Sequence, residues 1–279
     1  MQVKHRIRFP LYALLALSIV ALSPIPAASA AGDDTGTQSA LAAAIAGPQR
    51  SQPNRARDKY RHPMETLTFF GIKPTMTVVE ISPGAGWYTE ILAPLLKDHG
   101  KLYEAVGGGA GAKTFQDKLK ADPTDYGEVI VTTLKPPAET DIAPAGSADM
   151  VLTFRNVHDW LAHGNTQDYF KAFYRALKPG GVLGIVDHRA DPSQPQDPIA
   201  KNGYVRQDYM IQLAQQAGFK LTGASEINAN PKDLRDHPVW YLPPTLRLGE
   251  KDRDKYLAIG ESDRMTLKFT KPPTGAQAH

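Results

Sequence analysis

The stretch GIKPTMTVVEISPGAGWYT, residues 71–89, decides how the chain is expected to fold. It contains a short apolar strand, Thr77–Ile81, which runs into a glycine turn at residues 83–86 and then into a helix over residues 87–97. Gly84 and Gly86 lack a Cβ atom, so the backbone can turn sharply there and come close to a ligand. The following helix offers free backbone N–H groups at its start. A G-x-G turn between a strand and a helix therefore predicts a ligand-binding turn of an α/β protein.

The rest of the chain continues this alternation of strands and helices. Ligands of such sheets bind beyond the C-terminal ends of the strands, so we expect the loops 82–88, 154–160 and 187–190 to meet there. Alternation also indicates an α/β fold whose mostly parallel sheet is covered by helices on both faces. The patterns predict further strands over 101–106, 129–132, 148–153, 182–186, 219–227 and 264–269, and helices over 55–70, 114–120, 166–177 and 204–217.

Two segments carry a resemblance to a known family. Residues 71–89 resemble motif I of the class I S-adenosylmethionine (SAM)-dependent methyltransferases, and Leu-Lys-Pro-Gly-Gly at 177–181 is similar to a junction before that family's fifth strand. The resemblance covers residues 55–272 and, through GWYTE at 86–90 and NVHDW at 156–160, extends to an exported "predicted methyltransferase" group. It implies a Rossmann-like fold with a mostly parallel seven-stranded sheet, in which the two strands after residue 218 are antiparallel.

The same resemblance implies a SAM site. In the family, the acidic residue of the first strand and the glycine loop hold the amino-acid part of SAM. The adenosine end departs from the family, because the strand 101–106 ends in Val106-Gly107 rather than in an acidic residue for the ribose, and Thr133-Leu134-Lys135 stand where an Asp often contacts the adenine. Glu104 lies nearby, and its face of the strand is left open. The expected cofactor-binding residues are Glu80, Ser82, Pro83, Gly84, Ala85, Gly86, Trp87, Tyr88, Arg155, Asn156 and Asp187.

The loops after the fourth and fifth strands carry the candidate catalytic residues His158, Asp159 and His188. An imidazole can act as a general base near neutral pH, and Asp159 could orient His158 or hold a cationic substrate. The alternative is structural, with Asp159 capping a helix. His158 and His188 with Asp159 or Asp187 could also bind a metal, but no tight ligand spacing supports this, so no metal is expected.

Several other segments have weaker interpretations. Residues 107–114 are close to a P-loop, but Ala112 replaces the required glycine, so a flexible strand-to-helix turn is the better interpretation. Tyr204 and Arg206 could line the substrate side or lie on the surface. A long insertion over residues 230–264 could cover the site through His237, Trp240 and Tyr241, or form an ordinary packed loop. No G-x-S-x-G segment supports a serine hydrolase.

The N-terminus predicts export. Lys4, Arg6 and Arg8 precede an apolar run from Leu11 to Leu22 and an Ala-Ser-Ala site, so residues 1–30 are expected to be a signal peptide cleaved after Ala30. We therefore expect an exported, periplasmic protein with no membrane attachment after cleavage. Residues 31–54 are expected to be a flexible lead-in, residues 55–272 the methyltransferase-like domain, and residues 273–279 a flexible tail.

Composition excludes other classes. The chain has no Cys, so disulfides, thiolate metal sites and a Cys nucleophile are excluded. Of its 32 basic residues three lie in the first ten positions, which leaves 29 basic against 29 acidic residues elsewhere and no electrostatic case for nucleic acid. The favoured function is SAM-dependent methyl transfer to a small-molecule or unknown acceptor, with the oligomeric state left open. The alternatives are a non-catalytic binding protein on the same scaffold and an NAD-dependent oxidoreductase, the latter disfavoured by Thr89 at the third glycine position.

Overall fold

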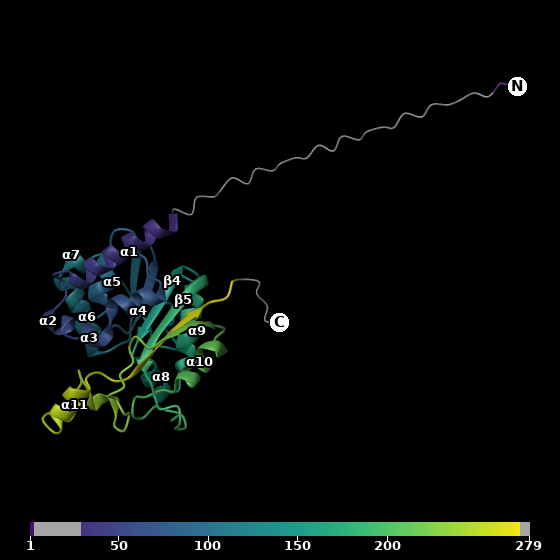
Figure 1. Cartoon of the computed structure of the whole chain (residues 1–279). Coiled ribbons are helices and arrows are strands. Elements are labelled where there is room, and N and C mark those ends of the chain that lie inside the picture. The colour runs from purple at the N-terminus through teal and green to yellow at the C-terminus, as the bar shows by residue number, and fades with distance from the viewer. Residues whose placement is uncertain (3–28, 274–279) are drawn as a thin grey trace.

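A computed structural model describes residues 1–2 and 29–273, which form one seven-stranded sheet flanked by helices (Figure 1). The strand order is β3-β2-β1-β4-β5-β7-β6, so the predicted α/β, Rossmann-like fold is confirmed. β1 and β4 lie side by side at the point where the strand order reverses, which is where ligands of open α/β sheets bind. The strands are β1 (Thr77–Ile81), β2 (Lys101–Val106), β3 (Ile130–Thr133), β4 (Ala148–Phe154), β5 (Leu177–His188), β6 (Lys220–Ser225) and β7 (Arg264–Thr270).

Only one of the two late strands runs against the sheet. β1 to β5 pair in parallel, and β7 pairs antiparallel with both β5 and β6. β6 is therefore parallel to β5, and the expectation that both late strands are antiparallel is wrong for β6. The physical reason is that a helix links β5 to β6, and a strand–helix–strand crossover brings the second strand back in the same direction.

Helices cover both faces of the sheet because side chains alternate along each strand. In β1, Val79 and Ile81 pack on the face covered by α8, α9 and α10, whereas Val78 packs on the face covered by α1, α4, α5 and α6 (Figure 1). The helices are α1 (Ser29–Ala46), α2 (Gln52–Arg55), α3 (Asp58–Arg61), α4 (Pro63–Phe70), α5 (Thr89–Leu96), α6 (Ala110–Ala121), α7 (Pro123–Tyr126), α8 (Val157–His163), α9 (Thr166–Ala176), α10 (Gln207–Gln216), the 3₁₀ turn η1 (Val239–Tyr241) and α11 (Arg253–Ile259).

The lead-in is not a flexible segment. Residues 31–54 contain α1 and α2, and Leu41 of α1 is 1% exposed in the core beneath α4 and α5. Gln49 donates to the backbone oxygens of Ala44 and Glu90 at 2.7 and 2.8 Å, which fastens the segment to α5. The prediction of flexibility relied on the polar and small composition, but a few apolar residues on one helix face are enough to dock an alanine-rich helix.

The expected helix over residues 55–70 is divided into α2, α3 and α4. His62 adopts a left-handed conformation with φ of 42°, which ends α3, and Pro63 opens α4. Gly71 closes α4 with φ of 83°. The break matters for function because it places the short helix α3 at the C-terminal edge of the sheet.

The signal-peptide prediction falls mostly on residues 3–28, which lie outside the described residues, as does most of the predicted tail. Export and cleavage after Ala30 therefore stay predictions. Within residues 29–273, no helix combines the length and the apolar character that crossing a bilayer requires.

Candidate functional site

The glycine turn after β1 lies between two adjoining hollows. The turn is built from left-handed residues, with φ of 49° at Ser82, 61° at Gly84 and 80° at Gly86. Ser82, Pro83, Gly84 and Asn156 line both hollows, so the two form one continuous site. The first hollow, of about 270 Å³, is completed by Val106, Gly107, Gly108, Gly111, Ala112 and Phe115. The second, of about 220 Å³, is completed by Asn54, Arg57, Arg61, Glu80, Ile81, Ala85, Trp87, Tyr88, Phe154, Arg155 and Pro244.

Gly84 and Gly86 differ in what a Cβ atom at each position would contact. A Cβ atom on Gly86 would come within 3.0 Å of the Phe115 ring and 3.3 Å of the Lys118 ammonium, so α6 packs directly against the turn. A Cβ atom on Gly84 would meet nothing within 4 Å, which means that this residue faces the open site. Lys118 fixes the turn from α6 by donating to the oxygen of Ala85 at 3.0 Å.

Asn156 links the C-terminal end of β4 to the C-terminal end of β1. Its side-chain nitrogen donates to the backbone oxygen of Ile81 at 2.9 Å and to the Thr153 hydroxyl at 3.1 Å. Arg155, immediately before it, has φ of 64° and donates its backbone N–H to Val186 at 2.7 Å. An arginine held in the left-handed region is costly, and such residues concentrate at ligand sites.

Two buried carboxyls lie side by side under α5. Glu80 and Glu104 are opposite each other in the parallel register of β1 and β2, and the Thr89 hydroxyl donates to Glu80 at 2.9 Å. Neither carboxyl oxygen of Glu104 has a donor among the described residues. Burial raises the pKa of Glu80 to about 7 and, together with the neighbouring Glu80 charge, that of Glu104 well above its usual range. The pair therefore shares a proton, and only Glu80 reaches the second hollow.

A cluster of four arginines surrounds one buried carboxylate at the other end of the second hollow. The glutamate is Glu261, which follows α11 and is 2% exposed. Burial alone would raise its pKa, but the arginines, Arg264 foremost, bring it down to about 2. The nearest guanidinium nitrogens lie 2.7 Å (Arg57), 3.1 Å (Arg264), 3.3 Å (Arg61) and 3.9 Å (Arg155) from its oxygens.

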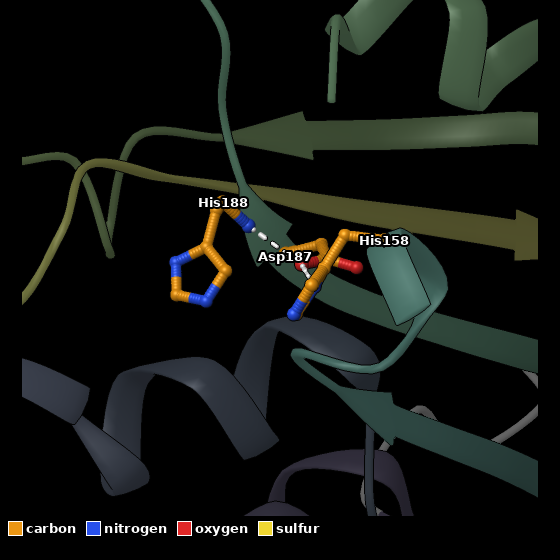
Figure 2. Close-up of side chains that lie close together, drawn as sticks. All are labelled: His158, Asp187 and His188. Atoms are coloured by element: carbon orange, nitrogen blue, oxygen red, sulfur yellow. Dashed lines mark hydrogen bonds and ion pairs between the residues drawn. The ribbon is translucent and has the colours of Figure 1, made fainter. Parts of the chain in front are cut away.

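A histidine and an aspartate, His158 and Asp187, are hydrogen-bonded to each other next to His188 (Figure 2). His158 Nδ1 is 3.0 Å from Asp187 Oδ1, and the other carboxylate oxygen accepts the backbone N–H of Val157 at 2.8 Å. The same Oδ1 accepts the backbone N–H of His188 at 2.8 Å. Asp187 therefore orients His158 through Nδ1, a role for which the sequence analysis considered Asp159. Asp159 is 62% exposed and lies 3.5 Å from the far nitrogen, Nε2.

The two imidazoles have opposite proton affinities, although their rings are only 5.0 Å apart. Burial lowers the pKa of His158, but Asp187 more than offsets this and the pKa is raised. Burial also lowers the pKa of His188, and the neighbouring His158, Arg155 and Arg264 lower it further. His188 Nδ1 is bonded to the Ser262 hydroxyl. His158 is thus the proton acceptor of the pair, and His188 stays neutral beside it.

The same three residues are the metal candidate, because one ligand atom each from His158, Asp187 and His188 lies within 4.8 Å of the others. Both Asp187 oxygens already accept hydrogen bonds, and three arginines contribute to the low pKa of His188. A cation placed there would lose those bonds and meet positive neighbours. The arrangement is therefore better suited to moving a proton than to holding a metal.

The insertion over residues 230–264 does cover the site. The Trp240 ring of η1 lies 6.3 Å from the His158 ring, and Pro244 lines the second hollow. Tyr204 anchors this cover, since its hydroxyl donates to Asp233 at 2.8 and 3.0 Å. Tyr204 and Arg206 line neither hollow of the site, and Arg206 instead pairs with Asp208.

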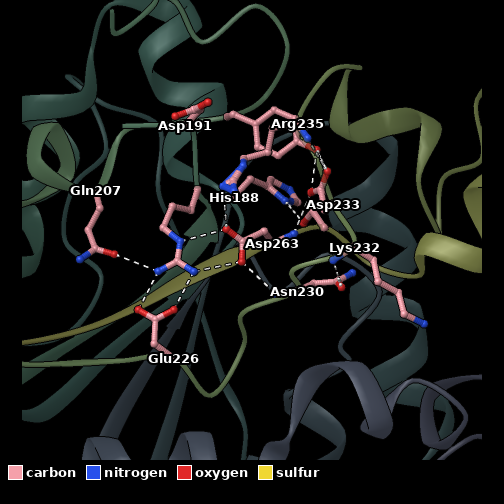
Figure 3. A network of polar contacts seen from close by, with 12 residues as sticks. His188, Asp191, Gln207, Glu226, Asn230, Lys232, Asp233, Arg235 and Asp263 are labelled. Carbon is pink, nitrogen blue, oxygen red and sulfur yellow. Dashed lines mark hydrogen bonds and ion pairs between the residues drawn. The ribbon is translucent and has the colours of Figure 1, made fainter. Parts of the chain in front are cut away.

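A larger hollow, of about 500 Å³, lies at the outer side of β5 and is lined by residues that include Arg189 and Arg235. The guanidinium of Arg189 is already paired with Asp263, Glu226 and Gln207, three residues that Figure 3 labels. None of the predicted site residues lines this hollow. This hollow is therefore separate from the site at the glycine turn.

The predicted residues are largely brought together. Of the expected cofactor-binding set, all but Gly86 and Asp187 line the hollows. Asp187 is wrong as a cofactor contact, because it is fully buried and bonded to α8. The residues that the sequence analysis missed are Arg57, Arg61, Glu261 and Arg264. Arg57 and its partner Glu261 are 204 positions apart, so no spacing in the sequence marks these residues as a cluster.

Comparison with known proteins gives the fold a family context. No family model matches the chain. A phosphoethanolamine N-methyltransferase of Triticum aestivum is 30% identical over 96 residues, which is 34% of this chain and only 19% of the wheat protein. A SAM-dependent methyltransferase of Aquifex aeolicus superimposes with a TM-score of 0.54 at 16% identity, covering 84% of this chain and 98% of that one. The [4+2]-cyclase SpnF superimposes with a TM-score of 0.55 at 12% identity, covering 87% and 95%. The chain therefore has the fold of SAM-dependent methyltransferases, which also carries another reaction.

Proposed function

We propose that the protein is a SAM-dependent methyltransferase whose acceptor is a small molecule. The observation that carries the proposal is the pair of joined hollows that share the glycine turn at the end of β1. The first hollow is walled by Val106, Ala112 and Phe115 and suits a flat base and its sugar. The second is walled by charged groups and suits a zwitterionic amino acid. This division matches the two ends of SAM.

The residues of the chain fit that cofactor unevenly. Glu80 supports the second hollow from below and can meet an ammonium group, while Gly84 gives the backbone free access to the ligand. The end of β2 offers Val106 and the backbone of Gly107 and Gly108 to a sugar, because Glu104 points under α5 instead. The second hollow would therefore bind the amino-acid end of SAM through charged groups. The first hollow would bind the adenosine end through its shape and through backbone groups.

SAM, when bound, supplies a methyl group on a positively charged sulfur. The part of this chain in the reaction is to position the acceptor and to take its proton. Asp187 holds the Nδ1 proton of His158, so Nε2, which lies 3.5 Å from the exposed Asp159 carboxylate, is the nitrogen that would take the proton of the acceptor. Trp240 and η1 cover the imidazole, which is 5% exposed, and so keep water from it.

Export is part of the proposal. Residues 1–30 carry the signal-peptide pattern, so we propose that the mature protein acts outside the cytosol, in the periplasm of a diderm cell. SAM would then have to reach that compartment. The balanced charge of the remaining chain favours a small acceptor over nucleic acid.

The test is calorimetric titration of the chain from Ala31 onward with SAM and with S-adenosylhomocysteine (SAH). Gly111 lines the first hollow, and a Cβ atom there would meet nothing within 4 Å. We expect Gly111→Leu to fill the hollow and weaken SAH binding by more than about tenfold, with no loss of helix stability because Leu is the better helix former. Lys120→Leu, on the exposed side of the same helix, is the matched control.

Micromolar binding that Gly111→Leu abolishes and Lys120→Leu retains would support the proposal. Absence of binding at millimolar SAM and SAH would overturn it. The fold would then serve another ligand, and binding of NADH in the same titration would identify the oxidoreductase alternative.

A further inference from the structure

We infer that the arginine cluster (Arg57, Arg61, Arg155 and Arg264 around Glu261) is the binding subsite for an anionic group of the methyl acceptor. The inference rests on the proposed function and names its substrate class: a small molecule that carries a carboxylate or a phosphate beside the atom to be methylated. Arg57, Arg61 and Arg155 line the second hollow, so the cluster is open to a ligand there.

The cluster has more positive charge than its own residues neutralise. Four guanidinium groups surround the single carboxylate of Glu261, which is 2% exposed. A buried excess of charge is costly unless a counter-charge is supplied. This electrostatic cost lowers the proton affinity of Arg61. Burial and the neighbouring arginines lower its pKa to about 9 in spite of Glu261.

The cluster also has unused hydrogen-bond donors. Arg57 Nη2, Arg155 Nε and Arg264 Nε are buried and have no hydrogen-bond partner among the described residues. Two of these three arginines line the hollow directly. Buried donors of this kind are normally satisfied, so their presence marks a place where a ligand completes the structure. Guanidinium groups match carboxylates and phosphates in particular, because two parallel N–H groups can bind two oxygens.

The charge of SAM does not complete the cluster. The amino-acid end of SAM carries one carboxylate, but it also carries an ammonium group, and the sulfur beside it is positive. Bound SAM therefore adds net positive charge to a region that already holds four arginines against Glu261. A second anion is needed for neutrality, and in a two-substrate reaction the acceptor is the molecule that can bring it.

The position of Arg155 places that anion beside the proton acceptor. Arg155 directly follows β4, and His158 lies three residues later in the first turn of α8. Arg155 has a left-handed backbone conformation and lines the second hollow. Its guanidinium lies 3.9 Å from the Glu261 carboxylate. Arg155 lies close enough to His158 to offset part of the rise in its pKa, so an acceptor anchored on Arg155 and Arg57 would lie near the proton acceptor, although His158 itself lines neither hollow.

The experiment titrates inorganic phosphate, as the anion probe, into the SAH-loaded chain from Ala31 onward. We expect phosphate to bind the loaded wild type, and Arg57→Gln and Arg155→Gln each to weaken phosphate at least about tenfold and by more than they weaken SAH, which shares the second hollow. Arg155→Lys keeps the positive charge but not the two parallel N–H groups of the guanidinium. It should therefore weaken phosphate binding less than Arg155→Gln does. Arg253→Gln, in α11 and paired only loosely with Glu250, is the control and should change neither affinity. Equal melting temperatures would show that the variants are folded.

The outcomes separate the two proposals. SAH binding without phosphate binding would overturn the acceptor subsite and leave the proposed function intact. A parallel loss of SAH affinity in Arg57→Gln and Arg155→Gln would also overturn it, because the cluster would then hold the carboxylate of the cofactor. Failure of SAH to bind the wild type would overturn the proposed function and the acceptor assignment together.

Discussion

Two buried glutamates of the same site, Glu261 and Glu80, have opposite protonation behaviour. Each is 2% exposed, and burial by itself raises the pKa of both. Four arginines outweigh burial at Glu261 and bring its pKa down to about 2, whereas burial outweighs the neighbours of Glu80 and raises its pKa to about 7. The charge of a buried carboxyl therefore depends on whether the neighbours that the fold brings to it outweigh burial. One end of the second hollow is fixed in charge, and the other can gain or lose a proton near neutral pH.

The largest effect is expected at Glu261. Glu261→Gln removes the only carboxylate within 4 Å of the arginine cluster among the described residues, so the arginines would be left buried without a counter-charge. We expect a loss of about 3–5 kcal/mol in the free energy of unfolding, measured by urea denaturation at pH 7. Glu250→Gln, whose side chain is 91% exposed, is the control. A loss below about 1 kcal/mol would mean that the cluster does not depend on this charge.

The pH dependence of Glu261 has a definite sign. Its pKa is depressed in the folded state, so its contribution to stability is present above the unfolded pKa of about 4.5 and is lost as the pH falls toward about 2. We expect the wild type to lose stability across this acid range and Glu261→Gln to lose less. Denaturation curves at pH 5 and pH 3 would measure the difference.

The carboxyl pair should behave in the opposite way. The pKa values of Glu80 and Glu104 are raised in the folded state, so the folded chain holds a proton that the unfolded chain releases above pH 4.5. Stability then falls as the pH rises from 4.5 through about 7. Glu104→Gln removes one of the competing carboxyls, and we expect it to be more stable than the wild type at pH 8 by about 1–3 kcal/mol.

The control for this variant is Glu128→Gln, which changes an exposed carboxyl. The measurement is urea denaturation at pH 5 and pH 8. Equal pH slopes for the wild type and Glu104→Gln would contradict the shared proton.

A smaller effect is expected on cofactor affinity. If Glu80 meets the ammonium group of SAH, binding favours its ionised form, and the affinity should rise by about three- to tenfold between pH 6 and pH 8 as Glu80 loses its proton near pH 7. Calorimetric titrations with SAH at the two pH values would test it. A flat profile in the wild type would place the ammonium elsewhere.

The smallest effect is a shift in the titration of one histidine. Asp187 raises the pKa of His158 against the effect of burial, so Asp187→Asn should lower it, while His188 should remain neutral in both proteins. Nuclear magnetic resonance of the imidazole nitrogens between pH 5 and pH 9 would follow both rings. An unchanged His158 in Asp187→Asn would show that another group sets its proton affinity.

The sequence determined the frame of the site. Thr77–Ile81, the glycine turn that follows and the regular alternation of strands and helices predict the sheet, the turn and the edge where ligands bind, because these features depend on local conformation and on short repeating patterns. Local sequence patterns gave the wrong prediction for segments whose structure depends on a few tertiary contacts. Residues 31–54 look polar enough to be flexible, yet Leu41 and Gln49 dock them on α5. The direction of β6 likewise followed from its crossover and not from its composition.

Only the tertiary structure decided the electrostatics of the site. The partner of His158 is Asp187, 29 positions away, rather than the adjacent Asp159, because the backbone N–H groups at the start of α8 and at His188 hold the Asp187 carboxylate in place. Arg57 and Glu261, 204 positions apart, meet at 2.7 Å, and Glu80 faces Glu104 through the strand register. Local sequence patterns fix local geometry, whereas the charge of a buried group depends on through-space neighbours that segments far apart in the chain bring together.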